Sequence, residues 1–197
     1  KEGYFMFQNL NLNIDDISST IDENIKSSSI NYRGIYKIKS QNNLYFDVCG
    51  NSSDNNTPII LYPNNNHNNQ KFIIEPLEDT NITSSIQDLL NNISNRKEPN
   101  LYSIKAFHSK KSLDISSENK ANGAKLIQYE YHNGANQHFI IVPINNNNPN
   151  LVNIYIAHSN KVLDIPGANF KSKVQIQQYT ANNTIAQQFT LEKISDL

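Results

Sequence analysis

The pattern Gln-x-Phe occurs three times in this chain, as Asn69-Gln70-Lys71-Phe72, Asn136-Gln137-His138-Phe139 and Ala186-Gln187-Gln188-Phe189. An apolar run follows each copy, and an Asp and a Tyr precede it at fixed distances. The Tyr lies fifteen residues after the Asp, and the Gln lies eight residues after the Tyr. The upstream residues, in repeat order, are Asp47 and Tyr62, Asp114 and Tyr129, and Asp164 and Tyr179. Three copies with one spacing predict a protein built from three structural repeats.

The spacing resembles that of the ricin B-type lectin family, whose members include domains of plant toxins, bacterial haemagglutinins and glycoside hydrolases. The usual Gln-x-Trp of that family is Gln-x-Phe here, and the chain has no Trp. The resemblance covers about residues 33–197. It implies an all-β fold, a β-trefoil of about twelve strands. Six strands would close a barrel and three hairpins would cap one end of it, which removes most exposed sheet edges.

The repeats are expected at about residues 34–77, 102–144 and 152–194. Asp47 and Asp114 are 67 residues apart, whereas Asp114 and Asp164 are 50 apart. The difference predicts an insertion at residues 78–99. Apolar residues at helical spacing predict a short amphipathic helix over residues 84–94 of this insertion. Residues 1–32 lie outside the repeats, as an N-terminal extension or as the end of a preceding domain.

Composition narrows the function classes. The net charge is -1 and no dense Lys/Arg cluster occurs, which argues against a nucleic-acid partner. The longest apolar stretches are five to six residues, too short for a transmembrane segment. Cys49 is the single cysteine, so no internal disulfide can form. We expect a secreted protein that is a processed product or a piece of a longer polypeptide.

Asn is unusually frequent, with runs at residues 64–66 and 145–148. Asn tolerates the left-handed backbone conformation that turns require. We therefore interpret most of these Asn residues as turn formers and not as ligand contacts.

The repeated Asp, Tyr and Asn have the chemistry of a sugar site. An ionised carboxylate is an acceptor with two oxygens, which suits a pair of adjacent sugar hydroxyls. A Tyr ring offers a flat apolar face for the C–H face of a pyranose. The Asn before each Gln offers a donor and an acceptor to a third hydroxyl. A competing role for each Asp is to stabilise the turn that follows it.

By position, the resemblance implies three candidate sites. The first consists of Asp47, Tyr62 and Asn69, the second of Asp114, Tyr129 and Asn136, and the third of Asp164 and Tyr179, with Ala186 at the Asn position. Gln177 stands where family members often have a ligand-contacting Gln. Gln70, Gln137 and Gln187 also belong to the candidate sites. We expect these three Gln side chains to bond the loop backbone and not to contact the ligand. We predict the strongest binding at the second site, where Gly134 keeps the loop slim, and the weakest at the third.

The pairs His108-Ser109 and His158-Ser159 precede an Asp by a spacing that resembles a hydrolase triad. They recur once in each of two repeats, so they would lie far apart. We therefore expect no catalytic residues, no metal site and no cofactor. His67 and His132 are expected at the edges of the first and second sites.

Two functions remain open from the sequence. The first is a non-enzymatic lectin module that recognises cell-surface or polysaccharide glycans, galactose-type sugars by family resemblance. It would be the targeting part of a larger toxin, haemagglutinin or hydrolase. The alternative is a β-trefoil that binds a protein or packs against a neighbouring domain and has lost sugar binding.

Overall fold

The computed structural model describes residues 30–77, 101–145 and 147–197. The strands of these ranges all lie in one compact unit, from Asn31 to Leu197. The predicted helix at residues 84–94 and nearly all of the predicted N-terminal extension lie outside the described residues. Within these ranges the helices are short 3-10 turns, and none is long and apolar enough to cross a membrane.

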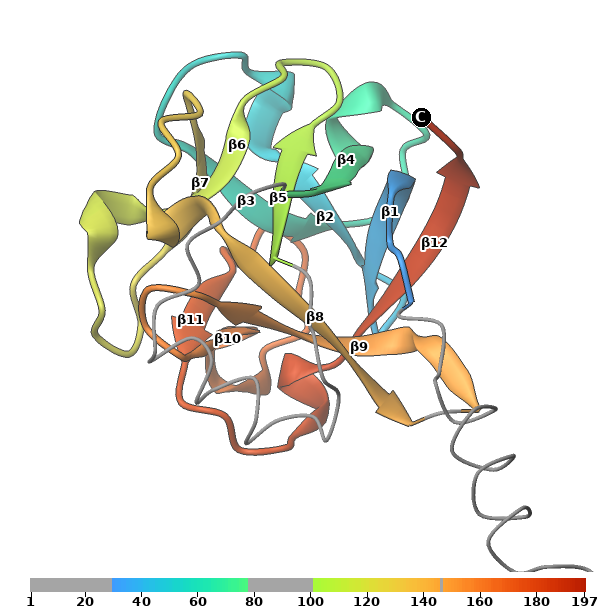
Figure 1. Cartoon of the computed structure of the whole chain (residues 1–197), viewed down its shortest axis with the longest axis vertical. Coiled ribbons are helices and arrows are strands. Elements are labelled where there is room, and N and C mark those ends of the chain that lie inside the picture. The colour runs from blue at the N-terminus through green and yellow to red at the C-terminus, as the bar shows by residue number, and fades with distance from the viewer. Residues whose placement is uncertain (1–29, 78–100, 146) are drawn as a thin grey trace, which may run out of the picture. The chain divides into compact units, whose positions relative to one another are not determined.

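Each repeat contributes four strands (Figure 1). The first repeat contains β1 (Gly34–Ser40), β2 (Tyr45–Val48), β3 (Thr57–Tyr62) and β4 (Phe72–Pro76). The second contains β5 (Leu101–Ala106), β6 (Ser112–Ile115), β7 (Leu126–Tyr129) and β8 (Phe139–Asn145). The third contains β9 (Asn148–Ile156), β10 (Val162–Asp164), β11 (Gln177–Tyr179) and β12 (Phe189–Ser195).

Six of these strands form a closed barrel. The antiparallel pairs β1–β4, β4–β5, β5–β8, β8–β9, β9–β12 and β12–β1 complete the ring. The remaining strands form the three hairpins β2–β3, β6–β7 and β10–β11. Contacts between β3 and β7, and bridges from Ile60 to Gln175 and from Lys125 to Gln177, join the hairpins to one another. The predicted all-β trefoil, with six barrel strands and three hairpins, is confirmed.

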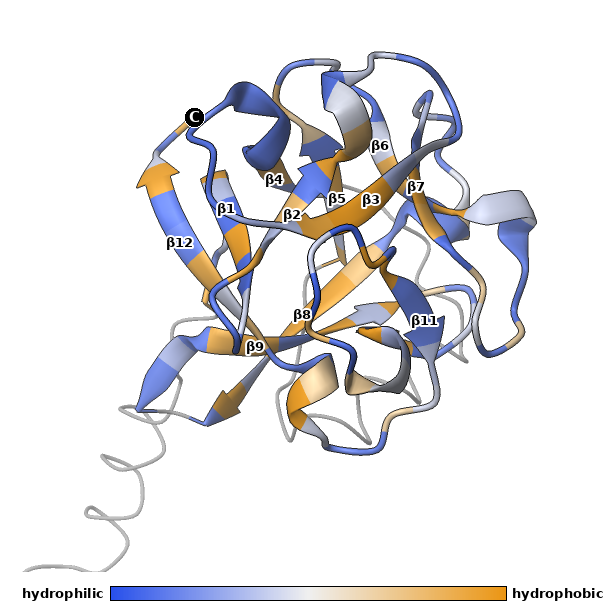
Figure 2. Ribbon diagram, turned by 180° about the vertical axis from the view of Figure 1, so that it is seen from behind, coloured by the Kyte–Doolittle hydropathy of each residue, from blue (hydrophilic) through white to orange (hydrophobic). Residues whose placement is uncertain are grey.

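The core repeats with the fold. Phe72, Phe139 and Phe189 begin the last strand of their repeats and are fully buried, as the sequence predicts. Phe46 packs edge-to-face on Phe72 and Phe189, with ring centroids 6.5 and 5.0 Å apart. The equivalent residues Leu113 and Leu163 are also fully buried. Figure 2 shows apolar residues concentrated along the strands and polar residues along the loops, the pattern that a closed barrel core requires.

Asn fills repeated turn positions, as interpreted from the composition. Among the described residues, seven of the twelve non-Gly residues with positive φ are Asn. Asn66, Asn133 and Asn183 each lie four residues before the repeat Gln and have φ of 59–60°. Each therefore turns the loop that approaches the candidate site.

Candidate functional site

Each repeat has a buried Asp at the end of its second strand or one residue before it. Asp47, Asp114 and Asp164 are only 3–5% exposed. The turns that follow them are η1 (Cys49–Asn51), η3 (Ser116–Glu118) and η5 (Pro166–Ala168). The residues opposite the three Asp on the neighbouring strand are, in repeat order, Ile60, Ile127 and Gln177. This cross-strand position is where the third repeat departs from the other two.

The Gln of each signature anchors its Asp. In the second repeat, Gln137 Nε2 donates to Asp114 Oδ2 at 2.8 Å and to the Glu130 carbonyl at 2.8 Å. Its Oε1 accepts from the backbone N–H of His132 at 2.9 Å. Gln70 and Gln187 make the same three bonds at 2.8–3.2 Å. All three Gln residues are buried, so they hold the Asp and the loop in place and do not reach a ligand.

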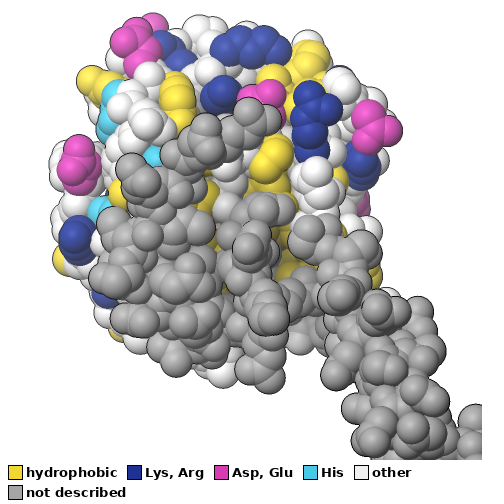
Figure 3. All heavy atoms as spheres, in the orientation of Figure 1, with side chains coloured by type: hydrophobic (Ala, Val, Ile, Leu, Met, Phe, Trp, Pro, Cys, Tyr) yellow, Lys and Arg dark blue, Asp and Glu magenta, His cyan; other side chains and the backbone are white. Residues whose placement is uncertain are grey.

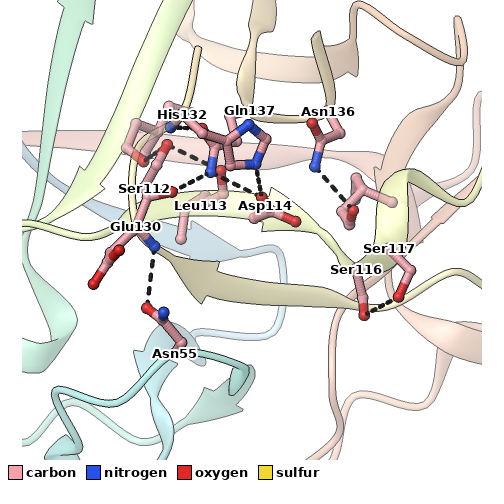
Figure 4. Close-up of polar contacts among 12 residues, drawn as sticks. Asn55, Ser112, Leu113, Asp114, Ser116, Ser117, Glu130, His132, Asn136 and Gln137 are labelled. Atoms are coloured by element: carbon pink, nitrogen blue, oxygen red, sulfur yellow. Dashed lines mark hydrogen bonds and ion pairs between the residues drawn. The ribbon is translucent and has the colours of Figure 1, made fainter. Parts of the chain in front are cut away.

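A second donor reaches the carboxylate in the first and second sites. Asn65 Nδ2 donates to Asp47 Oδ2 at 3.1 Å, and His132 Nε2 lies 3.3 Å from Asp114 Oδ2. Figure 4 shows His132 and Gln137 both pointing at Asp114. Among the described residues, every bond of good geometry to these two carboxylates is on Oδ2. The amides of Asn69 and Asn136 also lie close enough to lower the pKa of Asp47 and Asp114, but they donate to the backbone. Oδ1 is therefore left as an acceptor for a ligand hydroxyl.

The third carboxylate is engaged on both oxygens. Gln177 Nε2 donates to Asp164 Oδ2 at 2.9 Å, and Gln187 Nε2 donates to Oδ1 at 3.2 Å. Lys125 Nζ in turn donates to Gln177 Oε1 at 3.2 Å. Gln177 is buried and binds the Asp, where the family resemblance implied a contact to ligand.

The Asn before each Gln supplies an acceptor in two repeats. Asn69 Nδ2 donates to the Val48 carbonyl at 3.1 Å, and Asn136 Nδ2 donates to the Ile115 carbonyl at 3.3 Å. Both side chains are buried, and among the described residues neither Oδ1 has a hydrogen-bond partner. The sequence predicted a donor and an acceptor for the ligand, whereas the structure commits the donor to the protein. Both oxygens are enclosed by the protein, and an unpaired buried acceptor is costly.

Gly134 lets the second loop close over its Asp. A Cβ at this position would lie 2.6 Å from Asn136 Oδ1 and 2.5 Å from a His132 ring carbon. Both distances are shorter than van der Waals contact. Gly134 has an ordinary φ of -74°, so space and not backbone conformation requires it. The predicted slim loop is confirmed.

Burial perturbs the three carboxyl groups. Desolvation raises the pKa of Asp47, Asp114 and Asp164 above the usual value. Hydrogen bonds from Gln70, Gln137 and, in the third site, Gln177 oppose this rise. In the described ranges, no backbone N–H donates to any of these carboxylates. The alternative role as a turn cap therefore lacks the hydrogen bond that defines it.

The three Tyr residues lie beside their Asp with unequal exposure. Tyr62 and Tyr129 are half-buried, and Tyr179 is 40% exposed. The ring of Tyr129 meets His132 edge-on at 6.1 Å. The second site thus has a Tyr and a His flanking Asp114, consistent with the expected position of His132 at its edge.

The first site opens into a hollow of about 470 Å³. Its walls are formed by Asp47, Cys49, Gly50, Asn51, Ile60, Tyr62, Asn65, His67, Asn69 and Lys173. The hollow brings the predicted Asp, Tyr and Asn together, with His67 among its walls as expected. Cys49 and Lys173 were missed by sequence reasoning. No local signal marks Lys173, because it comes from the third repeat.

The His-Ser pairs join neighbouring repeats. His108 Nε2 lies 2.9 Å from the Ser52 carbonyl, and Ser109 Oγ donates to Gln128 Oε1 at 2.7 Å. Gln128 Nε2 then donates to the carbonyls of Ser52 and Asp54 at 2.9 Å. Ser159 and Gln178 make the equivalent link from the third repeat to the second. These hydrogen bonds give His108, Ser109 and Ser159 a structural role. Neither ring nitrogen of His158 makes such a hydrogen bond with the described residues.

Comparison with known proteins identifies a related family. Residues 89–179 match the family described as ricin-type beta-trefoil lectin domain-like. The resemblance to the ricin B-type lectin family is confirmed. No curated protein matches the chain in sequence.

Solved structures share the fold. ThreeFoil, a designed threefold-symmetric protein, is 23% identical over 82% of this chain and 99% of its own, with a TM-score of 0.65. An exo-beta-1,3-galactanase from Clostridium thermocellum is 22% identical over 82% of this chain, with a TM-score of 0.67. The match spans only 30% of that enzyme. The Macrolepiota procera ricin B-like lectin in complex with lactose is 16% identical over 85% of this chain and 100% of its own, with a TM-score of 0.59.

These identities are low enough that the structural likeness establishes the fold alone. The family match is to a lectin-like domain and supports a carbohydrate-binding module. Over the described residues on the face in Figure 3, acidic and basic side chains are interspersed.

Proposed function

We propose that this chain is a glycan-binding module with working sites in its first and second repeats. The observation that carries the proposal is a matched pair of unused acceptors. In each of these sites an Asp Oδ1 and an Asn Oδ1 accept no hydrogen bond from the described residues. A pair of vicinal sugar hydroxyls supplies two donors to such a pair of acceptors.

Binding would proceed without movement of the carboxylate. Gln70 or Gln137 already fixes the Asp through its other oxygen, so its orientation costs little entropy on binding. The half-buried Tyr62 or Tyr129 provides an apolar surface next to the acceptors, onto which a pyranose C–H face can pack.

The third site is proposed to be structural. Both oxygens of Asp164 accept from Gln side chains, and Ala186 supplies no side-chain acceptor. The sequence predicted the weakest binding at this site because the Asn is missing. The two hydrogen bonds to Asp164 are a second reason to expect weak binding there.

The finer biological assignment rests on analogy. The lectin neighbour binds lactose and the galactanase neighbour acts on a galactan, according to their descriptions, so galactose-type sugars are the first candidates. We propose that the module targets a larger secreted toxin, haemagglutinin or hydrolase to glycan-bearing surfaces. Two weak sites on one module would act together there through avidity.

A glycan array tests the proposal. The chain, the double variant Asp47→Asn/Asp114→Asn and the matched control Asp164→Asn are compared on the same array. We expect the chain and the control to bind the same glycans and the double variant to bind none. If the chain binds no glycan while its thermal unfolding is cooperative, the protein-interaction alternative replaces this proposal.

A further inference from the structure

Each candidate site receives one residue from a different repeat. The backbone N–H of Lys173 donates to the Leu61 carbonyl at 2.7 Å, beside the first site. Asn56 donates to Gln128 at 3.0 Å beside the second, and Gly123 donates to Gln178 at 2.9 Å beside the third. All three donors lie six residues before the Tyr of their own repeat and have positive φ, at 70°, 63° and 87°. They occupy one structural position, which we call the donated position (Lys173, Asn56, Gly123).

Lys is the unexpected residue at the donated position. Asn and Gly adopt a left-handed backbone readily, whereas Lys does so uncommonly and at some cost. Within residues 30–77, 101–145 and 147–197, no hydrogen bond, ion pair or ring contact engages the Lys173 ammonium group. The Lys is therefore explained neither by backbone conformation nor by an internal partner, and Lys173 is one of the residues that line the hollow of the first site.

The edges of the first and second sites differ in charge. The turn after Asp47 ends at Asn51, whereas the equivalent turn after Asp114 ends at Glu118. The first site thus combines the donated Lys173 with an uncharged turn, and the second combines the donated Asn56 with an acidic turn. The other ionisable residues that line the hollow are Asp47, Cys49, Tyr62 and His67. Gln70 and Asn65 donate to the Asp47 carboxylate.

We propose that the first site prefers an acidic saccharide and that Lys173 determines this preference. Asp47 Oδ1 and Asn69 Oδ1 would accept the sugar hydroxyls, and the Lys173 ammonium would pair with a carboxylate or sulfate group on the same ligand. This inference rests on the proposed glycan-binding function and assigns a ligand class to one of its sites. An ion pair at a partly open edge corresponds to a preference on the order of fivefold at low salt.

The test isolates the first site by using the Asp114→Asn background. This variant and Asp114→Asn/Lys173→Asn are compared on an array of matched neutral, carboxylated and sulfated glycans, and the best pair is titrated at low and high salt. Asn is the residue that the second site receives, and it tolerates the left-handed backbone. The double variant should therefore fold with an unchanged melting temperature.

We expect the Asp114→Asn variant to prefer the acidic member of the pair about fivefold at low salt and less at high salt. Lys173→Asn should remove this preference, so that the acidic and neutral members bind with equal affinity. The separate carboxylated and sulfated arms identify which acid is recognised. Equal binding of neutral and acidic glycans before the Lys173 change, or a preference that survives it, overturns the inference while leaving the glycan-binding function intact. Binding of no glycan at all overturns the function and this inference with it.

Discussion

Asp114 and Asp164 occupy equivalent positions in the second and third repeats, yet their carboxylate oxygens accept different sets of hydrogen bonds. Both are buried, and both accept a hydrogen bond from the Gln of their signature. Asp114 takes its two contacts on one oxygen, whereas Asp164 takes one on each. The decisive difference is the cross-strand neighbour, which is Ile127 in one repeat and Gln177 in the other.

The comparison shows that a repeated spacing preserves the architecture of a site without preserving its free acceptors. Gln137 and Gln187 anchor the Asp and the loop in the same way in both repeats. A single amide on the next strand then decides whether one carboxylate oxygen is left without a hydrogen bond from the described residues.

The largest expected effect concerns the core, in which the two repeats are alike. Phe139→Ala and Phe189→Ala should each lower the free energy of unfolding by about 3–5 kcal/mol, because each leaves a large cavity in a fully buried site. Urea denaturation followed by far-ultraviolet circular dichroism measures the loss. A small loss at one position only would show that the repeats are unequal in the core as well as at the site.

Asp114→Asn and Asp164→Asn separate the two repeats by function. In an Asp47→Asn background, Asp114→Asn should weaken glycan binding about tenfold to a hundredfold, the usual worth of a hydrogen bond to a charged group. Asp164→Asn should leave binding unchanged. Titration of an array-selected glycan by calorimetry measures both. Loss of binding in Asp164→Asn alone would reverse the comparison.

The same substitutions carry a stability prediction of known sign. Burial raises the pKa of each carboxyl in the folded state. At a pH between the pKa of the unfolded chain and the raised pKa of the folded protein, the folded state binds more protons than the unfolded state. The free energy of unfolding therefore rises as the pH falls through this range. Above it, the buried charge costs stability. Each Asp→Asn variant should therefore be as stable as the parent at pH 7, or more so, and its stability should depend less on acid pH.

Exchanging the cross-strand residues should sharpen the comparison. Ile127→Gln introduces an amide opposite Asp114, and Gln177→Ile removes the one opposite Asp164. The first should weaken binding at the second site about tenfold, because a sugar hydroxyl would lose its hydrogen bond to the charged Asp114 carboxylate. The second should free an Asp164 oxygen and produce measurable binding in an Asp47→Asn/Asp114→Asn background. Unchanged affinities in both variants would exclude this position as the determinant.

The smallest effect is on the pH dependence of the second site. His132→Asn gives this site the donor that the first site has in Asn65, and it removes a charge that lowers the pKa of Asp114. The carboxyl should then protonate at higher pH, so binding should fail at higher pH during acid titration. His138 is close enough to His132 to feel its charge. The pKa of His138 is lowered mainly by burial and, to a smaller extent, by the charge of His132. The measurement is glycan affinity from pH 4 to pH 7 in an Asp47→Asn background. If binding is lost at the same pH with and without His132→Asn, His132 does not set the pKa of Asp114.

The sequence by itself determined the fold and the approximate position of the sites. Three copies of one Asp-Tyr-Gln-Phe spacing predict three equivalent units, and the resemblance to the ricin B-type lectin family implies that they close into a β-trefoil. The same spacing assigned Asp47, Asp114 and Asp164 to strand ends and the three Phe residues to the core, because strand periodicity fixes which side chains face inward.

Only the tertiary structure decided which side chains surround each Asp carboxylate. The side chains that reach a carboxylate come from the next strand, as Gln177 does, or from a loop eighteen residues away, as His132 does. The hollow of the first site takes Lys173 from a repeat more than one hundred residues later. The spacing within a repeat does not predict these contacts. Hydrogen bonds and charge interactions form between residues that are close in space, and the folding of the barrel brings such residues together.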